Sequence, residues 1–117
     1  MDESGVNRLA LTANIESLEA LRRTPAGVAA VNCTLRHESS QIEAGQPRTV
    51  RVELPAVAMG EQAHVLAAAQ PGMQVKVTGF VAAKSLRSRI PVLHLTTIEF
   101  LEGYENGVQA QVQVQEA

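Results

Sequence analysis

Apolar and polar residues alternate with a period of two in five separate stretches of the chain. A two-residue period places successive side chains on opposite faces of an extended strand, so each stretch predicts a β-strand with one buried face. The stretches run from Leu9 to Ile15, from Val31 to Leu35, from Val50 to Leu54, from Met73 to Val81 and from Pro91 to Phe100. The pattern predicts an all-β fold.

Two of the five predicted strands contain an irregularity. Pro55 follows the third stretch directly, and because proline cannot donate a hydrogen bond to a neighbouring strand, we expect this strand to end there. In the fifth stretch the apolar positions change parity between Leu95 and Ile98. An extra residue in one strand produces such a change, so we predict a β-bulge near Thr96 and Thr97.

The alternation is absent between the third and fourth predicted strands. Residues 60–72 are rich in alanine and end in Gln-Pro-Gly, which is a stop signal for a helix. Val65, Leu66 and Ala69 share one face of a helical turn. This segment therefore predicts a short helix.

Residues 15–23 leave two alternatives open. Ile15, Leu18 and Leu21 have the spacing of a short helix, but the segment also continues the first strand without a break. We favour a bent continuation of the strand. Residues 24–27, with the sequence TPAG, predict a turn.

The predicted elements follow the order strand, strand, strand, helix, strand, strand. Five strands with one helix between the third and the fourth are the layout of the OB-fold, a small Greek-key barrel. A chain of 117 residues suits a single domain of this kind. OB-folds bind oligonucleotides on the face of strands two and three and on the loops that join strands one to two and four to five.

A basic loop joins the fourth and fifth predicted strands. Residues 84–89, KSLRSR, contain Lys84, Arg87 and Arg89. The formal net charge of the chain is −2, but residues 7–101 hold ten basic and seven acidic side chains, a net charge of +3. Because the acidic excess lies at the two ends, a cationic loop on this body is compatible with binding to the phosphates of a nucleic acid.

The sequence contains no recognisable catalytic or metal-binding pattern. Cys33 is the only cysteine, which excludes an internal disulfide and a zinc site made of thiolates. His37, His64 and His94 lack the spacing of metal ligands. A glycine-rich phosphate loop and a nucleophile elbow are also missing. We therefore expect a protein that is not an enzyme and holds no cofactor or metal.

The apolar runs are all far shorter than the roughly 18 residues that cross a bilayer. The N-terminal residues MDESG lack the basic and apolar regions of a secretory signal. We expect a soluble, cytoplasmic protein without membrane contact. A domain of this size buries a limited fraction of its surface, so association with a second copy would stabilise it.

Several stretches together resemble primosomal replication protein N, the PriB family of bacterial replication restart. They are NRLALTA (7–13), LRHESSQIEAG (35–45), LPAVAMG (54–60), VKVTGFVA (75–82) and LHLTTIEFLEG (93–103). The resemblance implies a homodimeric OB-fold that binds single-stranded DNA during primosome assembly. It also implies two protein partners, a PriA-type restart helicase and a helicase-loading factor.

Six cations at or near positions used by the family are the predicted nucleic-acid-binding residues: Arg22, Arg48, Arg51, Lys84, Arg87 and Arg89. The family's best-known type has two aromatic side chains where this sequence has Gln46 and Arg51, and a basic one where it has Glu38. An aromatic platform contributes about 1–3 kcal/mol per stacked base. The guanidinium plane of Arg51 can replace part of this contribution.

Phe80 leaves alternatives open. Its parity places it on the polar face of the fourth strand, with Lys76 and Thr78, where it could contact a ligand. A bulge at Gly79 would instead turn it into the core or an interface, and we favour this second alternative.

Two functions follow from these features. The first is a single-stranded-DNA-binding adaptor of replication restart. The alternative is an OB-fold protein-interaction module with weak or lost DNA binding, because an aromatic content of 3% leaves few stacking platforms.

We divide the chain into a flexible N-terminus (1–6), an OB-fold domain (7–102) and a C-terminal tail (103–117). Valine and glutamine alternate in residues 108–115, so the tail has two possible states. We favour disorder over the addition of an edge strand to a neighbour.

Overall fold

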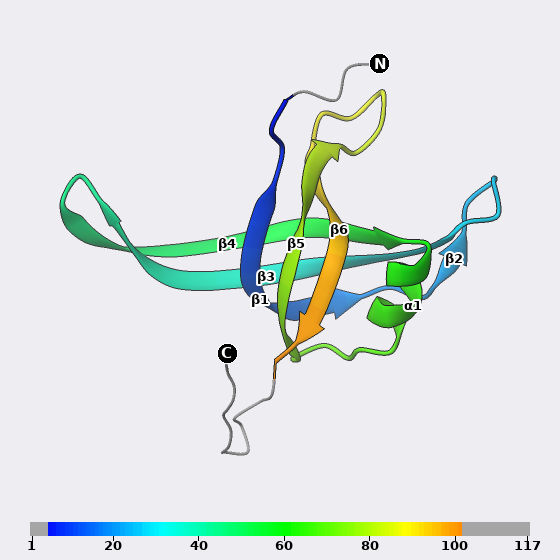
Figure 1. Cartoon of the computed structure of the whole chain (residues 1–117), viewed down its shortest axis with the longest axis horizontal. Helices are drawn as coiled ribbons and strands as arrows, with labels where there is room; N and C mark the ends of the chain where they lie inside the picture. The colour runs from blue at the N-terminus through cyan, green and yellow to red at the C-terminus, as the bar shows by residue number, and fades with distance from the viewer. Residues whose placement is uncertain (1–4, 102–117) are drawn as a thin grey trace.

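The computed structural model describes residues 5–101. The C-terminal tail and most of the N-terminal segment, for which disorder or strand addition was expected, lie outside the described residues. The elements are β1 (Leu9–Leu18), β2 (Arg22–Arg23), β3 (Ala29–Glu43), β4 (Gln46–Met59), α1 (Glu61–Ala67), β5 (Gln74–Ala83) and β6 (Pro91–Phe100). Five long strands and one helix between β4 and β5 reproduce the predicted order (Figure 1).

The long strands close into a barrel. Their order in the sheet is β1-β5-β6-β4-β3, with the short β2 added beyond β3, and β1 also pairs with β3 to complete the circle. The β4–β6 pairing is parallel and the other pairings are antiparallel. The parallel pair arises because the chain crosses from β4 through α1 to β5, and β6 then returns antiparallel to β5 and lies between β5 and β4.

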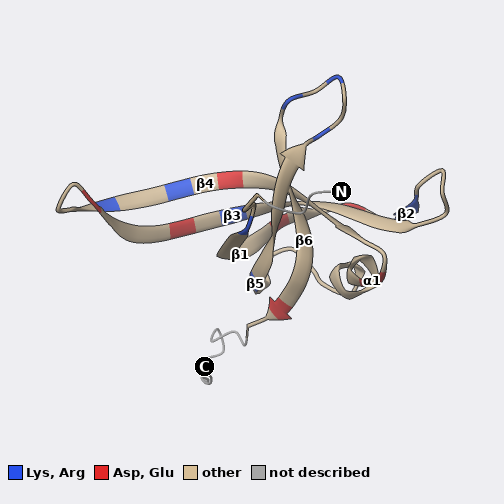
Figure 2. Cartoon of the chain, turned by 45° about the horizontal axis from the view of Figure 1, so that its top comes forward, with Lys and Arg blue, Asp and Glu red and all other residues tan. Residues whose placement is uncertain are grey.

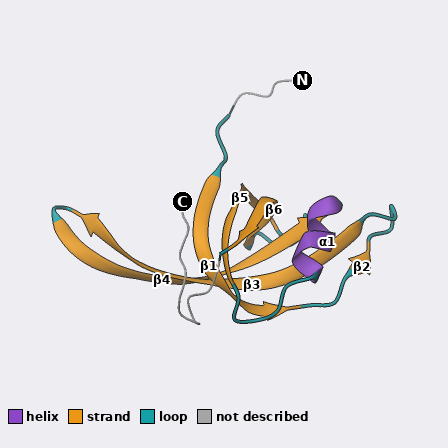
Figure 3. Cartoon of the chain, turned by 60° about the horizontal axis from the view of Figure 1, so that its bottom comes forward, coloured by secondary structure: helices purple, strands orange, loops and turns teal. Residues whose placement is uncertain are grey.

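The core consists of small and branched side chains from the inner face of every long strand. The largest fully buried side chains are Ile15, Val31, Leu35, Leu66, Val75, Val77 and Leu93. The helix packs against β3, β4 and β6 at one end of the barrel (Figure 3). It buries Ala63 and Leu66 and leaves Val65 half-buried, so the predicted helical face is rotated slightly towards Ala63.

The prediction that the third strand ends at Pro55 is wrong. β4 runs through this residue to Met59, and Pro55 pairs with Thr34. The pairing of β4 with β6 begins only at Ala56. At Pro55 the strand therefore has a single neighbour, and a proline is tolerated where one side of a strand is unpaired.

The segment 15–23 is extended, as favoured above. β1 continues to Leu18 with a register shift between Ile15 and Ser17, and Arg22–Arg23 forms β2. The predicted turn at 24–27 is confirmed by a hydrogen bond from the Gly27 amide to the Thr24 carbonyl.

The predicted bulge near Thr96 is confirmed. Thr78 pairs with Thr97 whereas Gly79 pairs with Leu95, so Thr96 is the extra residue on β6. The extra residue lies opposite Gly79 and does not invert β5. Phe80 consequently stays on the outer face of the barrel, so the core position in the favoured alternative is wrong, and the interface position stays a prediction.

β3 and β4 extend beyond the barrel as a two-stranded arm, which we define as residues 38–53. The arm has no third strand because the pairing of β3 with β1 stops at Arg36 and that of β4 with β6 starts at Ala56 (Figure 1). Its turn is Ala44-Gly45, with φ angles of 54° and 78°. Two central residues with positive φ make the tight turn that suits the twist of a hairpin.

Candidate nucleic-acid interface

The loop between β5 and β6 holds three exposed cations away from the barrel. The Lys84 amide donates to the Ile90 carbonyl at 2.8 Å, and the Ser85 hydroxyl accepts from the amides of Arg87 (3.2 Å) and Ser88 (3.1 Å). These bonds satisfy the loop's backbone without using its charged side chains. Among residues 5–101, Lys84, Arg87 and Arg89 form no ion pair, and Figure 2 shows their positions along the projecting loop.

Arg22 lies on the short strand β2, which pairs with β3 on the side away from β4, and its side chain is exposed. Its Nε and Nη2 atoms donate to Oδ1 of Asn32 at 3.2 and 2.8 Å. A neutral amide orients the guanidinium but does not cancel its charge. Arg22 is therefore positioned and still able to attract an anion.

A groove of about 540 Å³ brings Arg22 and Lys84 to one site. Its floor contains Asn32 of β3, Val57 of β4 and His94 of β6, and its one acidic member is Glu19. β3 and β4 are the second and third long strands of the barrel, so this is the face predicted for a ligand. The structure thus brings together two predicted residues that are 62 positions apart in the sequence.

Arg48 and Arg51 lie apart from this groove, on the arm. Arg48 Nη1 is 2.6 Å from Glu43 Oε1, and Arg51 Nε is 3.1 Å from Glu38 Oε2. All four side chains are exposed, and exposed ion pairs contribute only about 0.5 kcal/mol. Because residues 38–53 also contain Glu53, the arm holds three acidic and two basic side chains and has a formal charge of −1 (Figure 2). Its arginines can exchange their partners at little cost, since both ion pairs are exposed.

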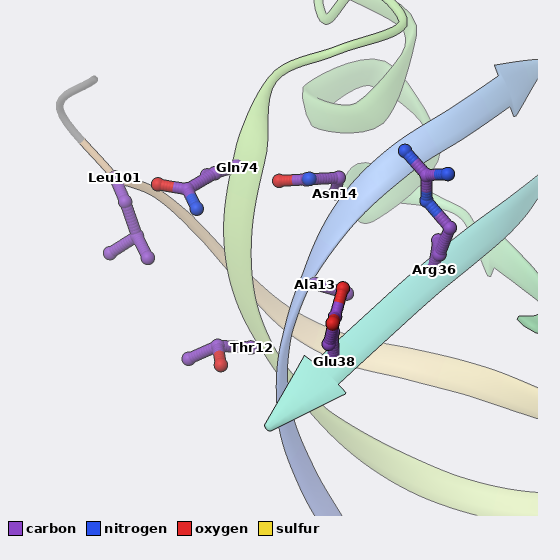
Figure 4. Close-up of a pocket in the computed structure, with 7 residues that line it drawn as sticks. All are labelled: Thr12, Ala13, Asn14, Arg36, Glu38, Gln74 and Leu101. Carbon is purple, nitrogen blue, oxygen red and sulfur yellow. The ribbon is translucent and has the colours of Figure 1, made fainter. Parts of the chain in front are cut away.

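A second hollow of about 400 Å³ lies over β1, β3 and β5 (Figure 4). Thr12, Asn14, Arg36, Glu38 and Gln74 line it, together with Ala13 and Leu101. Its arginine already pairs with Glu16 at 3.3 Å. None of the six predicted residues lines this hollow, and its charges are compensated, so it is less suited to a phosphate.

Sequence reasoning missed the partner of Phe80. The Phe80 ring stacks on the His94 ring, with centroids 5.0 Å apart and an angle of 6° between the planes. The two residues are direct neighbours across β5 and β6. The parity of β5 was a signal for the outward position of Phe80, but the pairing with His94 depends on the bulge at Thr96.

Cys33 also borders the groove. Burial raises the pKa of its thiol to about 11, and the negative charge of Glu19 adds to this rise. The thiol is therefore protonated at neutral pH and is a poor nucleophile. No group of three or more potential metal ligands lies together among the described residues. The groove offers two cations, an amide and the ring of His94, on which Phe80 stacks from outside the groove, and this is chemistry suited to binding a nucleic-acid strand.

No helix within residues 5–101 is long and apolar enough to cross a membrane.

Residues 7–97 match the model of a family described as another single-strand binding protein family. Replication restart protein PriB of Neisseria meningitidis serogroup C is 41% identical over 97 residues, which are 83% of this chain and 96% of that protein. PriB of Bordetella pertussis is 39% identical over 98 residues, 84% of this chain and 92% of that protein.

Solved structures agree with these relatives. The structure of PriB from Ralstonia solanacearum matches with a TM-score of 0.76 and 34% identity, covering 84% of this chain and all of that one. The single-stranded DNA binding protein of Thermus aquaticus matches with a TM-score of 0.69 and 23% identity, over 86% of this chain and 52% of that one. The predicted OB-fold is confirmed.

Proposed function

Because this chain belongs to the replication restart protein PriB family, we propose that it binds single-stranded DNA as a non-catalytic adaptor in replication restart. The observation that carries the proposal is the groove in which Arg22 and Lys84 meet on the outer face of β3, β4 and β6. Arg87 and Arg89 follow Lys84 in the same loop. Two cations and one acid, Glu19, line the groove, so its lining carries a net positive charge.

As an adaptor, the protein would connect the DNA to a PriA-type restart helicase and to the next helicase-loading factor. The family supports these partners, and the arm is a second surface on which a protein can be accommodated. Arg48 and Arg51 belong to the DNA site in this proposal only through exchange of their glutamate partners for phosphates.

The second candidate function is a protein-interaction module with little DNA binding. One feature favours it: the arm carries two ion pairs and Gln46 in place of aromatic side chains. Because the arm has a formal charge of −1, it would contribute little attraction to a strand of phosphates. The two candidates differ in whether the pure protein binds DNA at all.

The affinity for a fluorescent oligo-dT strand should fall steeply as salt increases. Each neutralised phosphate of a single strand contributes about −0.7 to the slope of log affinity against log salt concentration. If about four phosphates contact a pair of subunits, the slope is near −3 and a threefold increase in salt weakens binding roughly twentyfold. Fluorescence anisotropy from 50 to 300 mM salt measures this. Absence of binding at the lowest salt would favour the interaction module.

We also propose that the protein is a homodimer. β1 pairs with β5 from Leu9 to Asn14, whereas its pairing with β3 begins only at Asn14. Along residues 9–13 one edge of β1 therefore faces no strand among the described residues, apart from the Thr12 carbonyl, which accepts from His37 Nδ1 at 2.6 Å. An unpaired edge is a natural place for a second copy to add its own strand.

Sedimentation equilibrium at tens of micromolar protein should give about twice the chain mass of 12.5 kDa. Pairing of two β1 edges joins two sheets and removes unpaired backbone groups from each. A mass of 12.5 kDa at this concentration would contradict the dimer and leave the DNA-binding proposal to a single subunit.

A further inference from the structure

The aromatic pair Phe80–His94 lies between two hollows of the barrel. Phe80 is 40% exposed although it is a large apolar side chain on an outer face, and its ring lies parallel to that of His94. His94 lines the groove that contains Arg22 and Lys84. Phe80 lines a different hollow, of about 380 Å³, together with Asn7, Arg8, Thr78, Gly79, Thr96 and Thr97.

The strand register makes one continuous row of outer-face residues across the barrel. Asn32 pairs with Val57, Val57 pairs with His94, and His94 pairs with Phe80. Arg8 extends the row, because it directly precedes Leu9, which pairs with Gly79. We call this row, from Asn32 to Arg8, the transverse row. It runs across three successive pairings from Asn32 to Phe80, ends at Arg8 and passes over both hollows.

The charges around the transverse row are mostly positive. Arg22 and Lys84 lie beside its first part with Glu19, and Arg8 lies at its far end. Among residues 5–101, the side chains of Lys84 and Arg8 form no ion pair. A strand of phosphates that follows the row would meet cations on both sides of the aromatic pair.

The aromatic pair is held rigidly. The side chain of Asn7 donates to the Val81 carbonyl at 2.7 Å and accepts from the Val81 amide at 2.9 Å, which fixes β5 next to Phe80. On the other side, the hydroxyls of Thr78 and Thr97 bond across β5 and β6. A ring whose backbone is fixed on both sides loses little entropy when it takes up a ligand.

We propose that the Phe80–His94 pair is a stacking platform for a base, and that single-stranded DNA crosses the barrel along the transverse row from the Arg22–Lys84 groove to the hollow beside Arg8. This inference rests on the proposed function and adds to it a residue pair and a path. The rings supply the flat apolar surface that Gln46 and Arg51 do not provide on the arm. Base stacking is tolerant of sequence because every base presents such a face.

Phe80→Leu should lower the affinity for oligo-dT about fivefold or more, since truncation of a stacking aromatic typically reduces binding by at least this factor. Leucine keeps an apolar side chain on the outer face but removes the ring. The salt slope should stay the same, because stacking releases no counterions. For an abasic strand of equal length, wild type and variant should bind equally. The matched control is Phe100→Leu, since Phe100 on the same sheet is 41% exposed but lies outside both hollows.

A second measurement does not depend on the variant. In the wild-type protein, addition of oligo-dT should shift the NMR signals of the Phe80 and His94 ring protons, while those of the Phe100 ring stay in place. Unmoved Phe80 and His94 signals at saturating DNA would overturn the platform.

Other outcomes distinguish a failure of the stacking platform from a failure of the proposed function. If wild type binds oligo-dT and Phe80→Leu binds equally well, the platform is wrong and the proposed function stands. An equal loss of affinity for oligo-dT and for the abasic strand also overturns the platform. The ring would then affect binding of the sugar-phosphate backbone and would not stack on a base. Loss of the dimer in Phe80→Leu would assign the ring to a subunit contact instead. If wild type fails to bind oligo-dT, both proposals fail.

Discussion

A variant with Lys84, Arg87 and Arg89 all changed to Glu should lose about a hundredfold or more of its affinity for oligo-dT at 0.1 M salt. A slope of about −0.7 per phosphate corresponds to roughly fivefold per contact at this concentration, and three lost contacts multiply to about a hundredfold. Repulsion between the new carboxylates and the phosphates adds to the loss. Fluorescence anisotropy with the same oligomer measures it.

The fold of this triple variant should be intact. The three side chains are exposed, and the loop is closed by its backbone and by Ser85 and Ser88, which stay unchanged. Circular dichroism and the thermal midpoint should therefore match the wild type. An unchanged affinity would show that the loop is only solvated and would favour the interaction module.

A double variant with Arg48→Glu and Arg51→Glu should be compared with the triple variant in its loss of affinity for oligo-dT. These cations already have carboxylate partners at 2.6 and 3.1 Å, so they attract phosphates less than the unpaired loop cations do. We expect a clearly smaller loss of affinity per charge than in the loop. Lys76→Glu is the control for a change of net charge outside the transverse row. Lys76 lies near the other end of β5, where it pairs across the strands with Glu99.

Much of the fold could be predicted from the sequence because burial of one sheet face imposes a period of two on each strand. Parity alone placed Ile15, Val31 and Val77 in the core, and a parity change located the bulge at Thr96. The end of β4 could not be predicted in the same way. Whether Pro55 breaks a strand depends on its lateral neighbour, and that neighbour, β6, is distant in the sequence.

Part of the candidate site could likewise be predicted from the sequence, and part could not. The position of the basic loop followed from the order of the strands, because the loop between the last two strands reaches the ligand face of this fold. The Glu38–Arg51 ion pair of the arm could have been predicted, because counting outward from the Ala44-Gly45 turn places residue 38 opposite residue 51. The Phe80–His94 stack could not, because the register of β5 against β6 changes by one residue at the bulge.

Gly79→Ala should lower the free energy of unfolding by about 3 kcal/mol, near the upper end of the cost of overpacking a tight site. A Cβ at this position would lie 1.9 Å from the His94 carbonyl oxygen, 2.9 Å from its carbon and 3.2 Å from Leu95 Cα. All three are backbone atoms, which cannot rotate away as a side chain can. The strands would have to separate, and this would weaken their hydrogen bonds at the bulge. Urea unfolding followed by circular dichroism measures the loss.

Gly27→Ala separates this steric cost from the cost of backbone conformation. Gly27 has a φ of 85°, a strained angle for alanine, but a Cβ there would meet no atom within 4 Å. A non-glycine residue in the left-handed region costs about 1–2 kcal/mol. Gly79→Ala should therefore be the more destabilising of the two changes, although Gly79 does not have a positive φ. An equal or smaller loss for Gly79→Ala would mean that β5 and β6 can move apart freely beneath Phe80 and His94, and a platform on such a base would not be rigid.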